Sequence, residues 1–574
     1  MIHQLFNSEN NIFNRRQSSI FSAATIVMIM IAASRVLGLV RSRVLAHFFT
    51  AAALSPYLAA FRIPDTVFEV LVYGALSSAF IPVFTSYFTK NKKDEAWYVA
   101  TASLNIGVIC FSILAIIILI FAEPIYKIIA PGYTSAEIAQ IAVLTRILMA
   151  AQAFFVISYF LTGVLESTQR FLVPAIAPLF YNIGIIVTTA ILAPSLGIYA
   201  PALGAVVGAF LHFLIQLPIA YSLGFRWHKI LDFTHPGVRS IGKLALPRLI
   251  ELSFLEVGKF AELFLASLVS TAALTYFTFA NSFQLVPIGL FGTSIAKASL
   301  PVLSAQHARG ETKEFGKTLR ILFGQILFLV LPCSVFLVIL RVPLVRLVFG
   351  AEQFDWEATI QTGYALSAFA LGIFAQALIY LLARAFYALH DTVTPVRISI
   401  ASIFIEIIFG AIFILGMHLP IWSLALAFSI SSIAQCIGLL IALVQRLPEL
   451  KIDRFALVFG KITFTSFASG GLMFILLKIM DKSVWSEQLS FLGKMGLTIP
   501  TDFERFVLDT NYTINLLMLT VFVGLIGVLV YLGLSWLLKI EEMEILTKMI
   551  IKIKGFTMPK ASIQQESLTM EQEA

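Results

Sequence analysis

Charged side chains interrupt several long apolar stretches of this sequence. The segment SRVLGLVRSRVLAHFF begins at Ser34, directly after an apolar run, and contains Arg35, Arg41 and Arg43. An arginine near the centre of a bilayer costs about 2.5–3.5 kcal/mol on insertion scales, so a functional role is the default hypothesis. Guanidinium groups bind phosphate oxygens bidentately and stay charged when partly buried. We therefore predict that Arg35 and Arg41 bind an anion, and that Arg43 snorkels to the membrane surface from its helix end.

A second set of charges lies in PRLIELSFLEVGKFAELFLASLV, and its members are Arg248, Glu251, Glu256, Lys259 and Glu262. At 100° per residue, four of the five fall within about 80° of arc, along about 21 Å of helix. Such a stripe is expected to face protein or a water-filled cavity and not lipid. Pairing within the helix, three residues apart, is an alternative that is compatible with lining a cavity. The three glutamates are also candidates for binding a coupling ion.

The segment FRIPDTVFEVLVYG carries Arg62, Asp65 and Glu69 at spacings that allow local ion pairs. Asp65 and Glu69 are further candidates for an ion-coupling site. Three more charges stand alone in apolar stretches and are either functional or members of tertiary ion pairs: Lys297, Arg384 and Glu406. The pair His390-Asp391, followed by TVTP, is interpreted as a turn and not as a metal site.

The composition places these charges in a polytopic membrane protein. The chain has 574 residues, of which 59% are hydrophobic and 13% charged, and its mean hydropathy is +0.91. Soluble domains carry about 25% charged residues. The net charge of +8 is then better explained by membrane topology than by nucleic-acid binding. No P-loop, zinc spacing or nucleophile elbow occurs, and the three cysteines have unrelated spacings, so the sequence predicts neither an enzyme nor a metal site.

About fourteen segments have the length and polarity of membrane spans. They are expected at 20–48, 56–88, 97–122, 138–166, 172–193, 199–223, 240–268, 272–304, 319–348, 358–388, 395–416, 421–446, 455–480 and 512–538. The first is interpreted as a retained span and not as a signal peptide, because no small-residue cleavage site follows it. Lys and Arg gather in alternate short loops, which predicts that both termini are cytoplasmic.

The chain also repeats itself. GALSSAFIPVFTSYF resembles TSIAKASLPVLSAQH, with Pro82 and Pro301 lying 219 positions apart, and YFLTGVLESTQRFLVP resembles YLLARAFYALHDTVTP, with Pro174 and Pro395 lying 221 apart. The nearly constant offset predicts two parallel six-helix repeats around a central cavity. We expect an N-lobe over 1–223, a C-lobe over 224–446, two additional helices over 447–540 with an outward loop at 481–511, and a cytoplasmic tail over 541–574.

Six motifs carry a resemblance to a known family. SRVLGLVR, FRIP, GALSSAFIPVF, RFLVPAIAPLFYN, VPIGLFGTSIAKASLPVLS and RAFYALHDTVTPVRI occur in this order along nearly the whole membrane region. On these motifs and the span count, the sequence resembles the MurJ/MviN lipid II flippases. That family belongs to a superfamily that also contains multidrug/cation antiporters and polysaccharide flippases.

The resemblance implies two six-helix lobes around a cationic cavity, and two further helices that form a groove for a polyprenyl tail. It implies that lipid II, the undecaprenyl-diphosphate-linked peptidoglycan precursor, moves from the inner to the outer leaflet of the bacterial cytoplasmic membrane by alternating access. Ser34, Arg35 and Arg41 match the family's cavity-lining serine and arginines. The expected partners are this lipid, membrane lipids and cell-wall synthesis proteins, and no nucleic acid. No cofactor is expected, and coupling to membrane potential or to a monovalent cation stays open.

The sequence departs from the family pattern where two cations and two acids are expected. The cations fall at Phe68 and Ser282, an acid found in some members falls at Ser55, and the acid paired with the second cation falls at Asn281. Our hypothesis is that other cations replace them, which gives a substrate-binding set of Ser34, Arg35, Arg41, Arg62, Arg248, Lys259 and Arg384. The alternatives are a flippase for another polyprenyl-linked oligosaccharide, a drug/cation antiporter that uses the acidic residues, and a non-transporting envelope scaffold.

Overall fold

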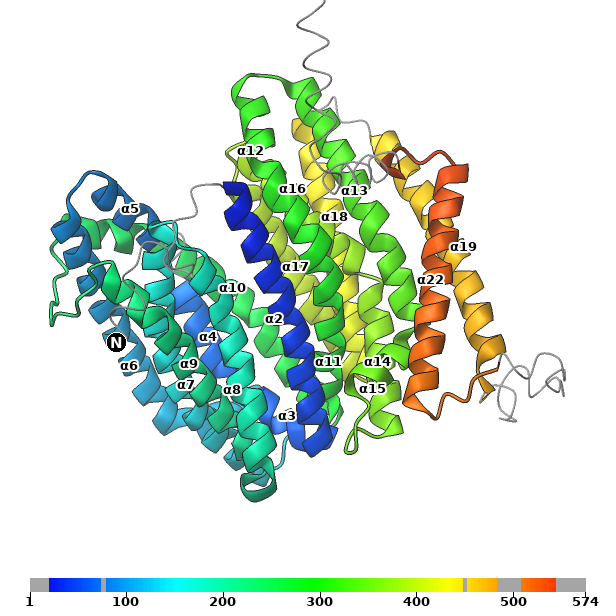
Figure 1. The fold of residues 1–574 in the computed structure, drawn as a ribbon, viewed down its shortest axis with the longest axis horizontal. Coiled ribbons are helices and arrows are strands. Elements are labelled where there is room, and N and C mark those ends of the chain that lie inside the picture. The colour runs from blue at the N-terminus through cyan, green and yellow to red at the C-terminus, as the bar shows by residue number, and fades with distance from the viewer. Residues whose placement is uncertain (1–19, 74–78, 448–451, 483–506, 544–574) are drawn as a thin grey trace, which may run out of the picture. The chain divides into compact units, whose positions relative to one another are not determined.

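Helices make up the chain, as its apolar composition predicts. The structure, a computed structural model, describes residues 20–73, 79–447, 452–482 and 507–543 (Figure 1). Within these ranges the regular structure is helical, and the one β-type contact is an isolated bridge between Asp481 and Leu508. The expected all-helical fold class is therefore confirmed. Most of the expected outward loop at 481–511 and most of the expected tail at 541–574 fall outside the described residues.

Ten helical stretches of the described residues are long and apolar enough to cross a membrane. Helices α15 (Trp356–Ala370) and α16 (Ile373–Ala388) would add an eleventh if they form one broken span. The count of fourteen stays a prediction. The span expected over 56–88 is divided into shorter elements: α3 (Ala51–Ala60), α4 (Arg62–Phe68), the π-helical turn η1 (Glu69–Tyr73) and α5 (Ile81–Thr89).

The chain forms two compact units. Unit 1 takes the described residues of Met1–Val286, Arg341–Gly372 and Thr392–Ile437, and unit 2 those of Pro287–Leu340, Ile373–Asp391 and Gly438–Ala574. The expected lobe boundaries at residues 223 and 446 stay a prediction. Unit 1 contains α3, α4, η1, α5 and α15. It also contains α2 (Ile20–Phe48), α6 (Lys93–Ile129), α7 (Ser135–Ser167), α8 (Leu172–Leu196), α9 (Tyr199–Ser222), α10 (Pro236–Val269), most of α11 (Ala273–Pro287), α14 (Arg341–Phe349), α17 (Val393–Ala411), η4 (Ile412–Gly416) and most of α18 (Trp422–Arg446). Besides α16, unit 2 contains η3 (Ile288–Thr293), α12 (Ser294–Ala308), α13 (Thr312–Ile339), α19 (Ile452–Met480) and α22 (Thr513–Leu537).

Glycines bring α8 and α9 together in unit 1. A methyl group at Gly204 would lie 2.9 Å from the Cα of Ile185, and one at Gly208 would overlap the backbone of Tyr181. Small residues at such crossings let membrane helices approach closely where no hydrophobic effect drives them together. In unit 2, α19 and α22 meet through a hydrogen bond of 2.6 Å from the Ser469 hydroxyl to the Gly527 carbonyl.

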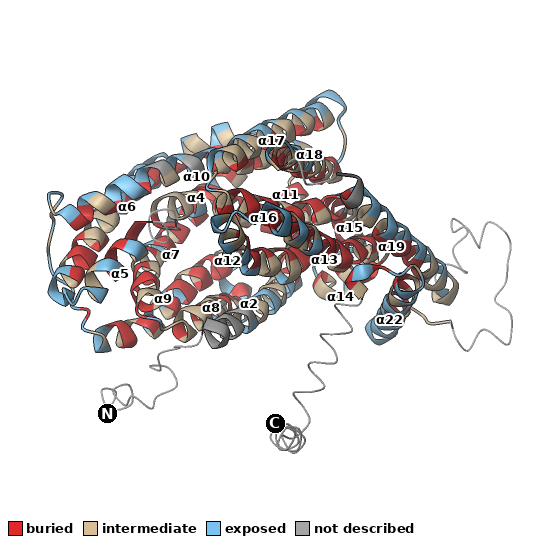
Figure 2. Cartoon of the chain, turned by 90° about the horizontal axis from the view of Figure 1, so that it is seen from above, coloured by how far each residue is buried: buried red, intermediate tan, exposed pale blue. Residues whose placement is uncertain are grey.

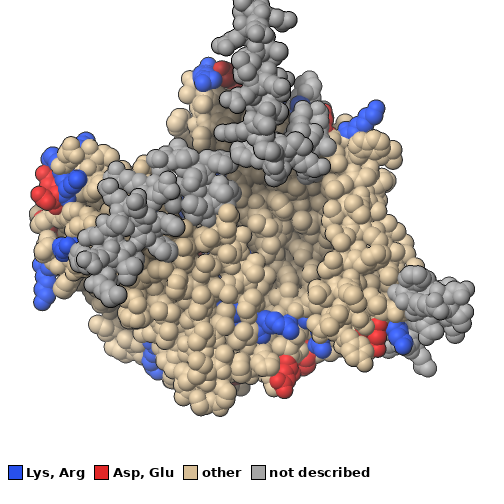
Figure 3. Space-filling view, viewed as in Figure 1, with Lys and Arg blue, Asp and Glu red and all other residues tan. Residues whose placement is uncertain are grey.

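The outward sides of the helices are apolar. On α6, Ile113, Ile116 and Ile120 are each more than half exposed, and Figure 2 shows exposed residues along this helix and buried ones between helices. Charged side chains on the visible face gather near helix ends (Figure 3). A surface of this kind is unfavourable in water and normal against lipid hydrocarbon.

A left-handed backbone turn occurs twice at one of the offsets expected from the sequence. Gln169 and His390 have φ values of 62° and 58° and lie 221 positions apart. In each turn the next residue, Arg170 or Asp391, donates its N–H to the carbonyl five positions earlier, at 2.9 and 3.0 Å. This is the hydrogen bond that closes a helix C-terminus. The turn expected at His390-Asp391 is therefore confirmed.

A second pair of turns lies at the other offset. Asn91 and Gly310 have φ values of 58° and 72° and lie 219 positions apart. Lys92 and Glu311 then donate their N–H groups to carbonyls five positions earlier, at 3.2 and 3.0 Å. The backbone thus supports the duplication that the sequence motifs predict.

Candidate functional site

A network of charged side chains joins α4 and η1 to α10 in unit 1. The Nζ atom of Lys259 lies 2.6 Å from a carboxylate oxygen of Glu69 and 2.6 Å from one of Glu256. The hydroxyl of Thr66 donates to the other Glu256 oxygen at 2.7 Å. The Glu256 side chain is 4% exposed, whereas those of Lys259 and Glu69 are 37% and 42% exposed. The network is therefore held on α10 by a buried acid and is open to water at the Lys259–Glu69 pair.

Arg62 and two glutamates extend this network along α10. Arg62 Nη2 lies 3.7 Å from Glu262 Oε2, and the Glu262 carboxyl is close enough to the carboxyl of Glu406, on α17, to interact with it. Glu256, Lys259 and Glu262 stand three positions apart, so they follow one face of α10. This spacing places Glu262 of α10 where its carboxylate can pair with Arg62 of α4.

Asp65 has a partner from a third direction. The amide nitrogen of Gln152, on α7, lies 3.0 Å from Asp65 Oδ1. Gln152 is 4% exposed, and its amide oxygen has no hydrogen-bond partner among the described residues. Asp65 itself is exposed. A buried amide that holds one oxygen of a carboxylate leaves the second oxygen free to bind a cation, a proton or water.

The charged face of α10 was predicted from the sequence, but some of the side chains that contact it were not. The predicted pair of Lys259 with Glu256 is present, and Arg62 pairs with Glu262 on another helix and not with its neighbour Asp65. Gln152 was not expected, and the only signal for it is one amide in an apolar run. Glu406 was left open between two roles, and it meets an acid and not a cation.

The first cationic motif lies on α2, which runs through Gly38 as an unbroken helix. Ser34 is half-buried and Arg35 is exposed. Arg41 is partly buried and acts electrostatically on the hydroxyls of Tyr57 and Tyr181. Neither arginine forms an ion pair or a hydrogen bond with the described residues, so both guanidinium groups can bind an anion.

Arg43 behaves differently from the other two arginines. Its Nη1 atom donates to the carbonyls of Leu347 at 2.7 Å and Val348 at 3.3 Å, in the last turn of α14. The carbonyls at a helix C-terminus lack partners within the helix and carry partial negative charge. The structure therefore gives Arg43 a protein partner, where the sequence suggested snorkelling alone.

Of the remaining candidates, two lie on α10 and two in unit 2. Arg248 is half-buried on α10, about two turns before Glu256, and the side chain of Glu251 lies outside the described residues. In unit 2, Arg384 is half-buried on α16, with its guanidinium 5.7 Å from the centre of the Tyr387 ring. Lys297 is exposed on α12.

Uncharged contacts occupy the positions where the family pattern expects charge. Phe68 packs edge-on against Tyr159, with ring centres 4.8 Å apart. Ser282 donates to the Phe279 carbonyl at 2.6 Å, and Ser55 is buried in a hydrogen bond of 2.7 Å with the Tyr133 hydroxyl. These three positions therefore serve packing.

Comparison with known proteins identifies the family. A family model described as "Lipid II flippase MurJ" matches residues 44–495. A Vibrio cholerae serotype O1 protein described as probable lipid II flippase MurJ is 29% identical over 411 residues, which cover 69% of this chain and 77% of that protein. The match includes Arg62, Lys259 and Gln152 within its range and begins just after Arg43.

Solved structures agree on the fold. A lipid II flippase MurJ in an inward closed conformation gives a TM-score of 0.71 at 22% identity, covering 90% of this chain and 98% of the other. An inward-facing multidrug resistance MATE family transporter of the MOP superfamily gives 0.60 at 17% identity, covering 74% and 98%. Because the family model spans well over half of its length, the chain belongs to the MurJ family of lipid II flippases.

Proposed function

We propose that this protein flips lipid II, the diphosphate-linked lipid precursor of peptidoglycan, from the inner to the outer leaflet of the bacterial cytoplasmic membrane. The observation that carries the proposal is the family match over residues 44–495. Family membership indicates transport and not catalysis. A diphosphate cannot cross hydrocarbon unaided, whereas the lipid tail can stay in the bilayer. Moving the diphosphate across the membrane therefore requires cations that face a polar path.

The two free arginines of α2 are the best candidates to bind the diphosphate. Arg35 and Arg41 make no ion pair with the described residues, whereas Lys259 and Arg62 already contact carboxylates. A cation that is neutralised by two acids attracts a further anion weakly. We therefore assign substrate binding first to Arg35 and Arg41, with Ser34 beside them, and assign Lys259 and Arg62 to holding α4 against α10.

The acidic surplus of the network suits a coupling cation. Five carboxyl groups (Asp65, Glu69, Glu256, Glu262 and Glu406) surround two cations (Arg62 and Lys259). Protons or a monovalent cation, driven by membrane potential, would balance that charge during transport. Both termini are assigned to the cytoplasm from the loop charges, and the partners are membrane lipids and cell-wall synthesis proteins.

The test is depletion of this protein in its host, with outer-leaflet lipid II as the readout. We expect outer-leaflet lipid II to fall and the inner-leaflet pool to rise, and the wild-type chain to restore both. Unchanged levels in a strain without a second flippase would remove the proposal.

A second candidate is antiport of an organic cation. It is favoured by the surplus of carboxyl groups, and the likeness to a MATE transporter, which is one of fold alone, is compatible with it. It predicts increased sensitivity to cationic compounds on depletion, with lipid II distribution unchanged.

A further inference from the structure

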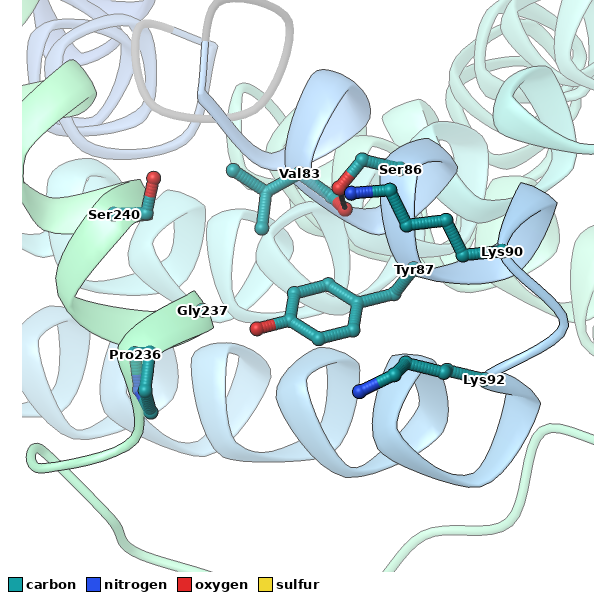
Figure 4. A pocket seen from close by; sticks show the side chains of 8 residues that line it. All are labelled: Val83, Ser86, Tyr87, Lys90, Lys92, Pro236, Gly237 and Ser240. Atoms are coloured by element: carbon teal, nitrogen blue, oxygen red, sulfur yellow. Dashed lines mark hydrogen bonds between the residues drawn. The ribbon is translucent and has the colours of Figure 1, made fainter.

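A cavity of about 360 Å³ lies in unit 1, away from the charged network, where α5 ends and α10 begins (Figure 4). It is lined by Val83, Ser86, Tyr87, Lys90, Lys92, Pro236, Gly237 and Ser240. The volume falls at the small end of the range for ligand pockets, about 300–1,000 Å³. Neither the proposed flipping of lipid II nor the coupling network uses these residues.

The lining is rich in hydrogen-bond donors and contains no carboxylate. Lys90 makes no ion pair with the described residues, and the hydroxyls of Tyr87 and Ser240 make no hydrogen bond with them. Lys92 lies 3.1 Å from Glu95, but both side chains are about half exposed, so the pair is weak. An ammonium group has three donors and no acceptor, so these groups call for a ligand rich in acceptor oxygens.

Gly237 shapes the wall of the cavity. A methyl group there would lie 2.7 Å from Val99 Cγ2 and 3.0 Å from Tyr87 Cε2. The missing side chain therefore allows the start of α10 to approach the Tyr87 ring, whose hydroxyl points toward this wall in Figure 4. The Gly237 N–H is occupied by the His235 ring at 3.1 Å, so the donors of the cavity are mainly side chains and not the helix terminus.

The loop before α10 fixes this wall in place. Asp232 accepts hydrogen bonds from the Tyr98 hydroxyl at 3.0 Å and from the Thr234 and His235 N–H groups at 2.7 and 3.2 Å. Asn105 donates to the carbonyls of the same loop. Because Tyr98 and Asn105 belong to α6, the loop, α6 and α10 form one braced frame. A pre-organised frame loses little conformational entropy when a ligand binds.

We propose that this cavity binds the phosphate group of an anionic membrane lipid, with Lys90 and Lys92 as its charged ligands and the Tyr87 and Ser240 hydroxyls as donors. The cavity lies at helix ends, where lysines are frequent in the sequence and where a lipid headgroup would be found. A phosphate offers several acceptor oxygens and a negative charge, which matches the lining. Soluble phosphate has the same chemistry, so the experiment must separate the two sources.

The test measures ligand-induced stabilisation of the purified full-length chain in a neutral detergent. The probes are short-chain phosphatidylglycerol, short-chain phosphatidylcholine and inorganic phosphate, and the readout is the concentration that gives half of the maximal rise in Tm. The Lys90→Gln/Lys92→Gln variant should need at least about tenfold more phosphatidylglycerol, since each surface lysine contributes roughly a factor of five. Ser240→Ala should need only about threefold more phosphatidylglycerol, because it removes one neutral hydrogen bond.

The control is Lys229→Gln/Lys313→Gln, which removes two exposed lysines outside the cavity. Its half-maximal concentration should stay within about twofold of wild type, and phosphatidylcholine should stabilise little. An equal loss in the control would mean a general basic surface and would overturn the proposal, as would no stabilisation of the wild type. If inorganic phosphate acts as strongly as phosphatidylglycerol and the cavity variant loses both, the lipid assignment is overturned in favour of soluble phosphate.

Discussion

Three arginines on one helix differ in what they touch, and that difference separates a ligand from a structural anchor. Arg35 and Arg41 form no ion pair or hydrogen bond with the described residues, whereas Arg43 holds the last turn of α14. Replacing each by alanine should therefore have opposite effects. Arg35→Ala and Arg41→Ala should lower flipping by tenfold or more and change stability by under about 0.5 kcal/mol. Arg43→Ala should cost about 1.5–3 kcal/mol, the range for hydrogen bonds made by charged groups, and keep most activity.

The measurements for this set are complementation of a depleted strain and Tm in detergent. Arg41→Lys serves as a control because it keeps the charge and loses the bidentate geometry. If Arg35→Ala and Arg41→Ala both flip lipid II normally, neither arginine is a ligand.

Lys259 should act chiefly on stability. Its removal leaves the buried Glu256 and the half-exposed Glu69 without their shared cation. Since breaking a buried pair costs about 3–5 kcal/mol and this one is partly open to water, Lys259→Met should cost about 1–3 kcal/mol. Adding Glu256→Gln should recover part of the lost Tm. A Tm for Lys259→Met that equals the wild-type value would show that the pair contributes nothing.

At the scale of elements, the loop between α9 and α10 depends on one ionised carboxylate. Hydrogen bonds from the Thr234 hydroxyl and N–H, with further ones from Tyr98 and His235, lower the pKa of Asp232 from its ordinary 3.8 to about 2. A depressed pKa stabilises the folded form above the ordinary value, and this contribution is lost as the pH falls from about 4 through 2. The loop should therefore stay ordered to about pH 4 and loosen below it.

Trp227, in this loop, donates to Asn105 at 3.0 Å and can report the change. Its fluorescence should titrate over that range, with Trp227→Phe as the blank. Asp232→Asn should raise hydrogen exchange of the loop at neutral pH. Asp94→Asn, at an exposed carboxylate on the first turn of α6, should not, and equal exchange in the two variants would contradict the role of Asp232.

The crossing of α8 and α9 gives a second prediction at this scale. Gly208→Ala should lower Tm or prevent folding, because the new methyl group would overlap the backbone of Tyr181. Gly107→Ala on α6 is the matched control, since no atom lies within 4 Å of its added methyl group. It should be neutral or stabilising by up to about 1 kcal/mol, because alanine favours helix. Equal Tm values for the two variants would show that the helices can separate at no cost.

At the scale of the whole molecule, the distribution of Lys and Arg predicts which loops lie inside the cell. In a background without the native cysteines, Lys229→Cys should react with a membrane-impermeant thiol reagent only after permeabilisation. Glu352→Cys, in the exposed loop between α14 and α15, should react in intact cells. Reaction of position 229 in intact cells would reverse the orientation assigned to the chain.

The sequence was sufficient for the fold class and the family, and partly sufficient for the site. Apolar segment length and two motif pairs predicted a duplicated helical bundle, because the bilayer sets span length and repeats preserve spacing. The face of α10 that carries Glu256 and Lys259 was readable from helical periodicity. The Gln152–Asp65 and Glu262–Glu406 contacts were not, because tertiary packing decides which distant polar groups meet.

The repeated turns have a consequence for how the two halves diverged. Equivalent backbone hydrogen bonds of the two halves lie 219 positions apart at Asn91 and Gly310. The offset is 220 at Ala130 and Gly350, whose N–H groups bond to carbonyls four residues earlier. It is 221 at the helix caps Thr134 and Asp355 and beyond them. The second half is therefore one residue longer than the first between the first two points, where α6 is continuous and its counterpart is interrupted at Leu340, between α13 and α14. An added residue rotates everything beyond it by about 100°, so a helix that must keep its packing face breaks there. That break is also the point at which the chain passes from unit 2 back to unit 1. This joint therefore coincides with a one-residue difference in length between the two halves.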